Sequence, residues 1–513
     1  MIKVFTAAGW IIPSRRSAWA GLIALVALSV SGSPFARAWA QDAAPPADAQ
    51  EAEPQPQVPA EAEEPEELVD PSETHKSAAL EVFKDPNAEL ALDVKKYPEI
   101  RANRMPSPQE IAQVKEMAGS PLVNVDPNVI TNVVNGMIAQ LTNSRNIQAA
   151  IDPNDKTNPN SSIARAVQEA TQNLLEPIFM ARAAKNVQFQ TRYNQILLQR
   201  LTPVLKHHLV PRIQAAIVLA QSGNPEALKT FLDEIQNPGQ TVWVKLWAFR
   251  GITIIESQSN RLSTAQEADA AKIISDQLAA NKNWPWPVQL RALEALGALR
   301  QGFLPTSPRT ADMAATIFQF LIDENLEPDV RAEAAKALGA LRITTAVPKY
   351  NFELAAYATA QYGAFLGENI LDLASDDKLY AQKLTTLLVG PVFQALEGNP
   401  ADRDSGLLRN PSLANRDEVQ KYLDAMRPMS KAATALMTAP TGQIPARTNE
   451  LSAAVTAFKD FLAKTPPADN HLFTGGPEYA APAAPAQAEA APAPADDASA
   501  AKPNALAGAS GGR

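Results

Sequence analysis

Four histidines are the first residues to examine for catalysis or metal binding. His75 and His471 lie near the two ends of the chain, whereas His207 and His208 are adjacent between two expected helices. Adjacent positions on a helix do not face each other, so this pair makes a poor metal site without further ligands. We therefore expect the histidines to be surface or loop residues, and we predict neither a metal site nor a cofactor.

The segment DPNDKTNPN begins like a calcium-binding loop, with Asp152 and Asn154 at its first and third positions. The likeness then ends, because Lys156 stands at the fifth position and Thr157 at the position of the required glycine. Ile163 also replaces the bidentate glutamate of such loops. The pattern indicates a polar connector between helices.

Paired carboxylates occur at Asp402 and Asp404 and at Asp323 and Glu324. Nothing in the sequence brings either pair to a common cleft, so we expect solvated turn residues.

The sequence contains no G-x-S-x-G, P-loop, H-E-x-x-H or dinucleotide glycine pattern. We predict that the chain is not an enzyme; the less favoured alternative is an all-α glycan-acting enzyme with two carboxyls about 5–9.5 Å apart.

Tryptophan gives the strongest signal for binding. Three of the seven lie within the first 40 residues, and the other four are Trp243, Trp247, Trp284 and Trp286. In the repeat alignment given below, Trp247 shares its position with the polar residues Gln214, Arg291 and Glu333, which indicates a solvent-facing register. The four rings are either peripheral core covered by a long connection, or a partly exposed patch that binds a protein partner or stacks on a sugar ring.

These residues must be positioned by helices, because apolar residues recur at spacings of three and four almost throughout residues 71–464. The fold class is therefore all-α. The expected helices cover residues 127–142, 161–200, 211–221, 225–235, 242–256, 264–280, 287–301, 309–322, 328–342, 351–367, 377–397, 417–437 and 448–464.

Four of the expected helices repeat one pattern. The segments PRIQAAIVLA, VKLWAFRGIT, VQLRALEALG and VRAEAAKALG align so that small residues coincide at Ala215, Ala248, Ala292 and Ala334. Each unit contains a second amphipathic helix. A single helix pair cannot bury such an apolar stripe, whereas stacked pairs can, and alanine or glycine at the crossings lets the backbones approach closely.

The repeated segments resemble the HEAT-like repeats of the kind found in phycobilisome lyases, with the pattern P-x-V-R-x-x-A-x-x-A-L-G followed by a turn and a second helix. Residues 328–342 match this pattern closely, residues 285–301 match it except at Gln289, and residues 242–280 match it poorly. The resemblance implies an α-solenoid of stacked helix pairs used mainly as a protein-interaction scaffold. It carries no catalytic residues to this chain.

A basic residue recurs at one position of the repeat, as Arg212, Lys245 and Arg331. A ladder of ligand-binding groups is one interpretation. Since such residues usually bond neighbouring turns in HEAT-like stacks, we favour a structural role.

Residues 1–40 have the character of a signal peptide. They contain four basic residues and no acid, a thirteen-residue, largely apolar run from Ala18 to Val30, and the small residues Ala38 and Ala40. The run is shorter than the roughly 20 residues of a membrane-spanning helix, which disfavours an uncleaved anchor. We expect cleavage after Ala40, export to the periplasm, cell envelope or medium, and no transmembrane segment in the mature protein.

The chain contains no cysteine, so disulfides do not contribute to its stability.

The segments that flank the helices have a different composition. Residues 41–70 contain ten acids, six prolines and no base, and residues 465–513 are rich in alanine and proline, so both are expected to be disordered. Residues 71–464 carry no net charge, because the chain's −9 comes from the +4, −10 and −3 of the three flanking segments. A basic face for nucleic acid is therefore not expected.

Together these features predict an N-terminal helical region at 71–208, a HEAT-like repeat solenoid at 209–400 and C-terminal helices at 401–464. The expected function is a non-catalytic scaffold that mediates protein–protein interaction in the cell envelope. The alternative is a carbohydrate- or peptidoglycan-associating envelope component that uses the four tryptophans.

Overall fold

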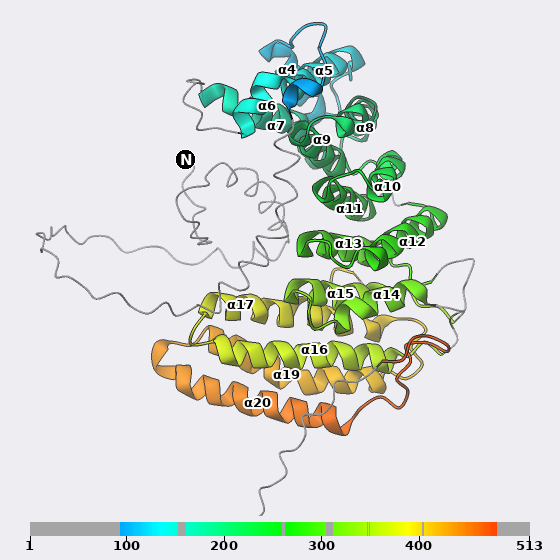
Figure 1. Cartoon of the computed structure of the whole chain (residues 1–513), viewed down its shortest axis with the longest axis vertical. Coiled ribbons are helices and arrows are strands. Elements are labelled where there is room, and N and C mark those ends of the chain that lie inside the picture. Colours follow the sequence, from blue (N-terminus) through cyan, green and yellow to red (C-terminus); the bar gives the residue numbers. More distant parts are fainter. Residues whose placement is uncertain are drawn as a thin grey trace, which may run out of the picture.

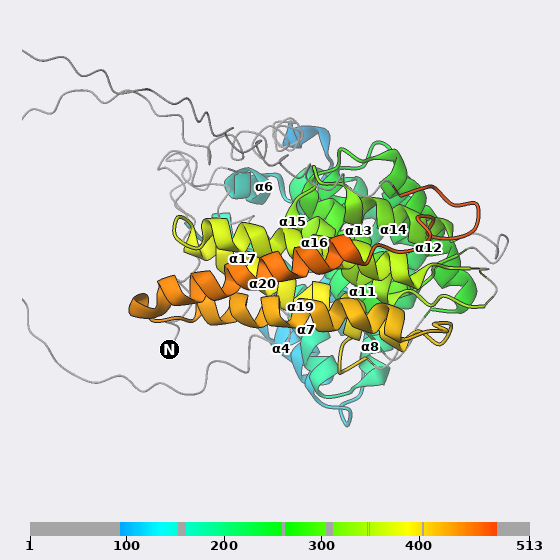
Figure 2. The ribbon, with the colours of Figure 1, turned by 90° about the horizontal axis from the view of Figure 1, so that it is seen from below.

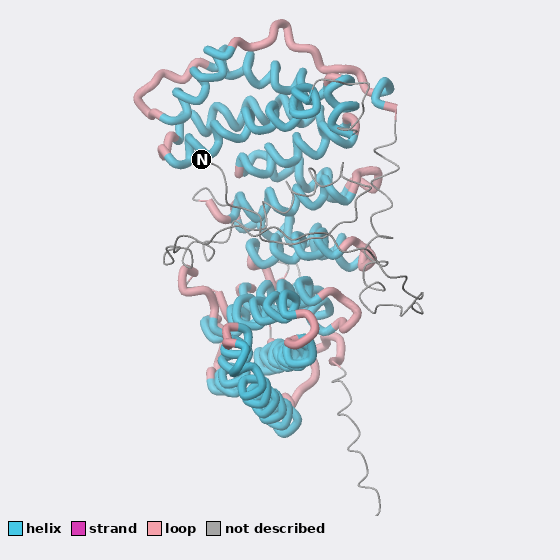
Figure 3. Tube along the Cα trace, turned by 90° about the vertical axis from the view of Figure 1, so that its left-hand side faces the viewer, coloured by secondary structure: helices cyan, strands magenta, loops and turns pink. Residues whose placement is uncertain are grey.

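The computed structural model describes residues 93–151, 161–258, 262–303, 311–345, 347, 349–402 and 405–479, with the backbone alone for 161–164. These residues are almost entirely helical and contain no β-strand, which confirms the all-α class (Figure 3). None of their helices is long and apolar enough to span a bilayer. The expected signal peptide, the acidic segment 41–70, the calcium-like loop and residues 480–513 lie outside the described part.

Figure 1 labels the helices with their order along the chain. The α-helices and helical turns are η2 (Val94–Lys96), α4 (Pro108–Gly119), α5 (Pro127–Thr142), α6 (Ser144–Ile151), α7 (Ser161–Ala183), α8 (Val187–Leu201), η3 (Thr202–Lys206), α9 (Leu209–Ser222), η4 (Pro225–Ala227), α10 (Leu228–Gln236), α11 (Val242–Glu256), α12 (Thr264–Ala280), α13 (Trp286–Leu299), α14 (Asp312–Ile322), α15 (Pro328–Ala340), α16 (Phe352–Leu373), α17 (Lys378–Leu387), η5 (Leu388–Val392), α18 (Phe393–Glu397), η6 (Leu407–Arg409), α19 (Asp417–Met437), η7 (Thr441–Gln443) and α20 (Ile444–Lys464).

The middle of the molecule is a stack of helices in two layers. Helices α9, α11, α13 and α15 pack one against the next to form the first layer (Figure 1). Helices α10, α12, α14 and α16 form the second layer in the same order. Each second-layer helix also contacts the following first-layer helix, so the apolar stripes are buried between successive pairs.

Separate groups of helices close the two ends of the stack. At the N-terminal end, α7 packs against α4, α5 and α6, and it contacts α9. At the C-terminal end, α16, α19 and α20 pack against one another, as the view from below shows (Figure 2). The glycines of α16 allow this contact, because a Cβ at Gly363 or Gly367 would lie about 2.6 or 2.5 Å from the sulfur of Met426 or Met429.

The small residues of the repeat lie at the crossings between first-layer helices, as predicted. The four aligned alanines, Ala215, Ala248, Ala292 and Ala334, are at most 2% exposed. A Cβ added to Gly297 of α13 would lie 3.1 Å from the Cα of Ala337 on α15. The small residues are therefore needed for the close approach of the backbones.

The recurrent basic residues bond backbone carbonyls, which confirms their structural role. Lys245 Nζ donates to the carbonyl oxygen of Ile235 at the end of α10 (2.8 Å), and Arg331 Nε donates to that of Leu321 at the end of α14 (3.0 Å). Gln289 replaces the basic residue in the unit between them and donates to the carbonyl of Lys282 (2.8 Å). Arg212 Nε donates to the carbonyl of His207 (2.9 Å). Each side chain ties a first-layer helix to the turn before it.

Two of the expected helices are interrupted. The helix expected at 161–200 breaks at Lys185, whose φ of 52° is left-handed, and Asn186 then caps α8. The Asn186 side chain also donates to the carbonyl of Met117 (2.8 Å), which ties this break to α4. The helix expected at 377–397 contains the π-helical turn η5 around Pro391, because proline cannot donate the usual helical hydrogen bond.

The expectation that the C-terminal tail is disordered from residue 465 is wrong for its first part. Residues 465–479 fold back onto the helices, and Leu472, Phe473 and Tyr479 are buried. Since these apolar side chains come before the Ala/Pro-rich sequence, the composition of the tail as a whole concealed them.

The start of α4 makes a testable prediction about pH. Hydrogen bonds from Arg104 and Ser107 lower the pKa of Glu110 from its ordinary value of 4.5 to about 2. Because the folded state favours the ionised carboxylate, this stabilisation is present above pH 4.5 and is lost as the pH falls through about 2. We expect a carboxylate titration by NMR to give a midpoint near 2 for Glu110. In Arg104→Gln the midpoint should move toward 4.5, and an unchanged midpoint would contradict the assigned cause.

Candidate functional site

His207 and His208 lie in the connection before α9, as loop histidines would, but the pair is buried and does not lie at the surface. His207 is 5% exposed and His208 is fully buried. The ring of Tyr97 packs against both imidazoles, with centroid distances of 5.4 and 5.6 Å. Burial lowers the pKa of His207, whose Nε2 bonds the carbonyl of Pro98 (3.0 Å). The pair therefore attaches the segment before α4 to the start of the stack.

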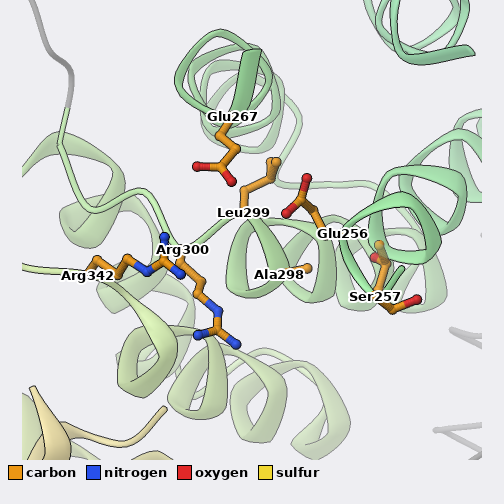
Figure 4. Close-up of a pocket in the computed structure, with 8 residues that line it drawn as sticks. Glu256, Ser257, Glu267, Ala298, Leu299, Arg300 and Arg342 are labelled. Carbon is orange, nitrogen blue, oxygen red and sulfur yellow. The ribbon is translucent and has the colours of Figure 1, made fainter. Parts of the chain in front are cut away.

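A small pocket of about 200 Å³ lies where α11 and α13 end (Figure 4). Glu256 and Glu267 lie on either side of Leu299, and the walls also include Arg300 and Arg342. Glu267 Oε2 accepts a hydrogen bond from Gln301 Nε2 (2.8 Å), and Glu256 Oε1 accepts one from the Leu262 backbone N–H (3.2 Å).

This pocket has the features of a structural junction. Its volume is below the roughly 300–1,000 Å³ of most small-molecule sites. Both carboxylates hold the connections that follow α11 and α13, because Glu267 bonds Gln301 and Glu256 bonds the Leu262 N–H. Since both side chains are engaged in this way, we base no catalytic proposal on the pocket.

The expected turn carboxylates have separate structural roles. Asp323 ends α14 and accepts a hydrogen bond from the Asn325 backbone N–H (3.1 Å), as a turn residue would. Asp402 instead forms an ion pair with Arg300, across 102 residues of sequence. Asp404 lies outside the described residues.

Charged side chains form a band across the first layer, which we define as Arg250, Arg291, Glu294, Glu333 and Lys336. Glu294 bridges α11 and α13, because its two carboxylate oxygens each lie 2.5 Å from a guanidinium, one of Arg250 and one of Arg291. Burial alone would raise the pKa of Glu294, but these two cations hold it below its ordinary value. Burial raises the pKa of Glu333, although Lys336 pairs with it at 2.9 Å. All five groups are engaged with one another.

The charged band explains why the position of Trp247 in the repeat suggested exposure to solvent. The expectation that Trp247 faces solvent is wrong, because its side chain is 3% exposed. The polar residues at the same position are also largely buried and bonded: Gln214 accepts from Thr171 (2.9 Å), and Arg291 and Glu333 belong to the charged band. Polarity at this register therefore reflects hydrogen bonds and ion pairs among packed helices, and it does not indicate exposure to solvent.

The four tryptophans do not form one exposed patch. Trp284 is 9% exposed and packs between Phe249, at 5.8 Å between ring centroids, and the Nζ of Lys245, 5.7 Å from its ring. Trp243 is half-buried at the start of α11. Trp286, at the start of α13, is exposed to 38%. Of the four residues predicted to bind a partner, Trp286 alone is exposed.

Trp286 belongs to a surface that also includes parts of α15 and α17. We define the Trp286 surface as Trp286, Asp329, Leu379, Tyr380 and Lys383. Leu379 is 72% exposed, so two of the exposed large apolar side chains of the described chain belong to it. Leu379 lies one turn before Lys383 on α17, and the Nζ of Lys383 reaches the Trp286 ring at 5.9 Å.

Lys383 forms the ion pair of this surface and contacts its aromatic rings. Its Nζ lies 2.5 Å from Asp329 Oδ2 and 5.3 Å from the centre of the Tyr380 ring. The Lys383 side chain is 40% exposed, whereas that of Asp329 is 18% exposed. Burial raises the pKa of Tyr380, and the nearby carboxylates of Glu327 and Asp329 add to this shift. The phenol therefore stays neutral near pH 7, and a lysine ammonium lies between two aromatic rings.

Sequence reasoning missed Leu379 and Lys383. The segment KLYAQKLTTLLVGPV was read as part of one long helix, and one exposed leucine in an apolar face gives no distinct signal. Pro391 within that helix was the available signal, since π-helical turns occur frequently at functional sites.

Among the described residues no group of three or more histidine, aspartate or glutamate side chains is arranged to hold a metal ion. No protein-family model matches the sequence, and neither a curated protein nor a solved structure matches it.

Proposed function

We propose that the chain is an exported, non-catalytic scaffold that binds another protein of the cell envelope. In this proposal residues 209–400 are an α-solenoid of HEAT-like helix pairs. The pairing of α9 to α16 in two layers supports it, because stacks of this kind present extended surfaces that suit protein binding.

The Trp286 surface is the observation that carries the proposal. Exposed apolar side chains gathered on one surface are typical of interaction sites, and tryptophan, tyrosine and leucine here surround one lysine. We infer a protein partner that covers Leu379 and Trp286 with apolar side chains. Lys383 already has a counter-charge in Asp329, so this ion pair can be covered without an unpaired charge.

The carbohydrate alternative receives less support from the geometry. Stacking on a sugar needs an open aromatic face, whereas the ammonium of Lys383 lies over one face of Trp286 and also near Tyr380. We therefore favour a protein surface as the ligand.

A pair of leucine variants tests the proposal. Leu379→Asp should reduce capture of the envelope partner by about 30-fold, the equivalent of a 2 kcal/mol hot spot, with little change in the unfolding temperature. Leu122→Asp is the matched control, since Leu122 is 95% exposed in the turn after α4. Equal capture by both variants would contradict the assignment of the Trp286 surface.

Export has its own test. N-terminal sequencing of the protein recovered from the envelope or medium should begin at Gln41, because Ala38 and Ala40 occupy the small-residue positions before it. Recovery of the protein with Met1 retained would contradict the proposed processing.

A further inference from the structure

The segment after α20 folds back onto the helices, and we define residues 465–479 as the C-terminal strap. Within it His471 and Glu478 form an antiparallel bridge, and Gly475 has a left-handed φ of 81° in the turn between them. Leu472, Phe473 and Tyr479 are 1–7% exposed. The strap is therefore a short, irregular segment held by three apolar anchors.

Tyr479 lies on α14 and α16, and we name the surface that the strap covers there the strap face. The ring of Tyr479 packs edge-on against Phe318 of α14, at 5.5 Å between centroids. Its hydroxyl donates to Gln361 Oε1 on α16 at 2.5 Å. The strap appears beside α14 and α16 as the orange-red loop in Figure 1.

Asn351, the N-cap of α16, holds the backbone of the strap. Its Nδ2 donates to the carbonyl oxygens of Asp469 (2.7 Å) and His471 (3.2 Å), and its own N–H donates to that of Leu472 (2.8 Å). These contacts do not involve the side chains of the strap. Asn351 is therefore able to hold the backbone of a different extended segment in the same way.

The strap leaves part of its surroundings unsatisfied. Arg331 is 5% exposed, and among the described residues its Nη1 has no hydrogen-bond partner. The same holds for the hydroxyl of Tyr350, which directly precedes Asn351. The Arg331 guanidinium carbon lies 4.6 Å from the centre of the Tyr362 ring, and Tyr362 directly follows Gln361, which accepts the hydrogen bond of the Tyr479 hydroxyl. Burial raises the pKa of Tyr479, and Arg331 opposes that shift. A buried donor without a partner is costly, and an acceptor brought to this place would remove that cost.

We propose that the strap face is a docking site for an extended segment of a protein partner, with the strap as its intramolecular competitor. The partner segment carries an apolar pair at the places of Leu472 and Phe473, and a carboxylate where Tyr479 approaches Arg331. This inference rests on the proposed function as a protein-binding scaffold, but its surface shares no residue with the Trp286 surface.

The strap competes efficiently because it is covalently attached, at an effective concentration on the order of millimolar. A labelled peptide with the sequence of residues 465–479 should therefore bind the full wild-type chain weakly. In Phe473→Ala, which removes one anchor of the resident strap, the same peptide should bind at least ten-fold more tightly. Tyr479→Ala is a second variant that removes a different anchor, and circular dichroism shows which variant remains folded.

The carboxylate is tested on the peptide, where it does not affect folding of the chain. A peptide with glutamate in place of Tyr479 should bind Phe473→Ala more tightly than the matched peptide with glutamine there. Equal binding of the two peptides would overturn the role of Arg331. No binding of any peptide to either folded variant would show that the strap is only a structural cap and would overturn the proposal.

Two further outcomes separate the possible occupants and the two surfaces. Dimers of Phe473→Ala that exchange straps, seen by light scattering, would identify a second copy as the occupant and contradict a partner segment. Leu379→Asp should leave peptide binding unchanged when combined with Phe473→Ala. A variant that loses partner capture but keeps peptide binding therefore bears on the proposed function. A variant that loses peptide binding but keeps partner capture bears on the strap face.

Discussion

Replacing Trp247 by alanine is expected to lower the free energy of unfolding by about 3–5 kcal/mol, as truncation of a buried tryptophan does. The side chain is 3% exposed in the middle of α11, a helix buried on nearly every side by α9, α10 and α13. The loss combines the transfer of a large apolar side chain to water with the cavity that remains. Denaturant unfolding followed by circular dichroism measures it.

Trp286→Ala is the matched control, because it removes the same side chain from an exposed position. We expect a loss of less than about 1 kcal/mol, which is typical of surface substitutions without a special role. Equal losses for the two variants would mean that Trp247 is not part of the core. Partner capture should show the reverse order, with Trp286→Ala the more affected.

A valine at Gly339 is expected to cost about 3 kcal/mol, at the upper end of the overpacking range. A Cβ at this position would meet the backbone of α18, with the Cα of Ala395 only 2.7 Å away and the carbonyl oxygen of Ala395 nearer still. The carbonyl of Gly339 also accepts a hydrogen bond from the Gly406 N–H (2.8 Å). Because the obstacle is backbone, no rotamer change relieves the clash.

Gly390→Ala serves as the control for this prediction. No atom lies within 4 Å of a Cβ built at Gly390, so the free energy of unfolding should be unchanged or slightly higher. Chemical denaturation of both variants measures the two changes in the free energy of unfolding. A Gly339→Val protein as stable as the wild type would contradict the packing of α15 against α18.

The repeat pattern predicted the helical stack for a physical reason. Small residues at a fixed register, such as Ala292, Gly297 and Ala334, are needed only where backbones come close, so their spacing reports the helix crossings. Glycine at the end of the A-L-G pattern has the same role twice, since Gly297 faces Ala337 and Gly339 faces Ala395. The short helix α18 therefore takes the place of the next first-layer helix.

The interruptions were harder to predict from local sequence. Lys185 adopts a left-handed φ because Asn186 bonds α4, a contact between residues 69 apart in the chain. The start of α4 did carry a readable signal, because Ser107 and Glu110 have the spacing of a capping box. The weak apolar periodicity of residues 108–119 hid this helix.

The candidate site was only partly accessible from the sequence. Trp286 was recognised as an unusual aromatic residue, but its neighbours on α15 and α17 are 43 to 97 residues away in the chain. A single sequence does not show which side chains meet across such separations. Polarity was also a poor guide to exposure, because Arg291 and Glu333 are polar and yet largely buried in ion pairs.

The central claim is that the Trp286 surface binds a protein partner in the cell envelope. The most direct measurement places a photo-crosslinking amino acid at Leu379 in the producing cells, with the same residue at Leu122 as the control. We predict that irradiation joins the Leu379 variant to one discrete protein species and leaves the Leu122 variant without it. The same species from both positions, or none from Leu379 in a folded and normally abundant protein, would contradict the account.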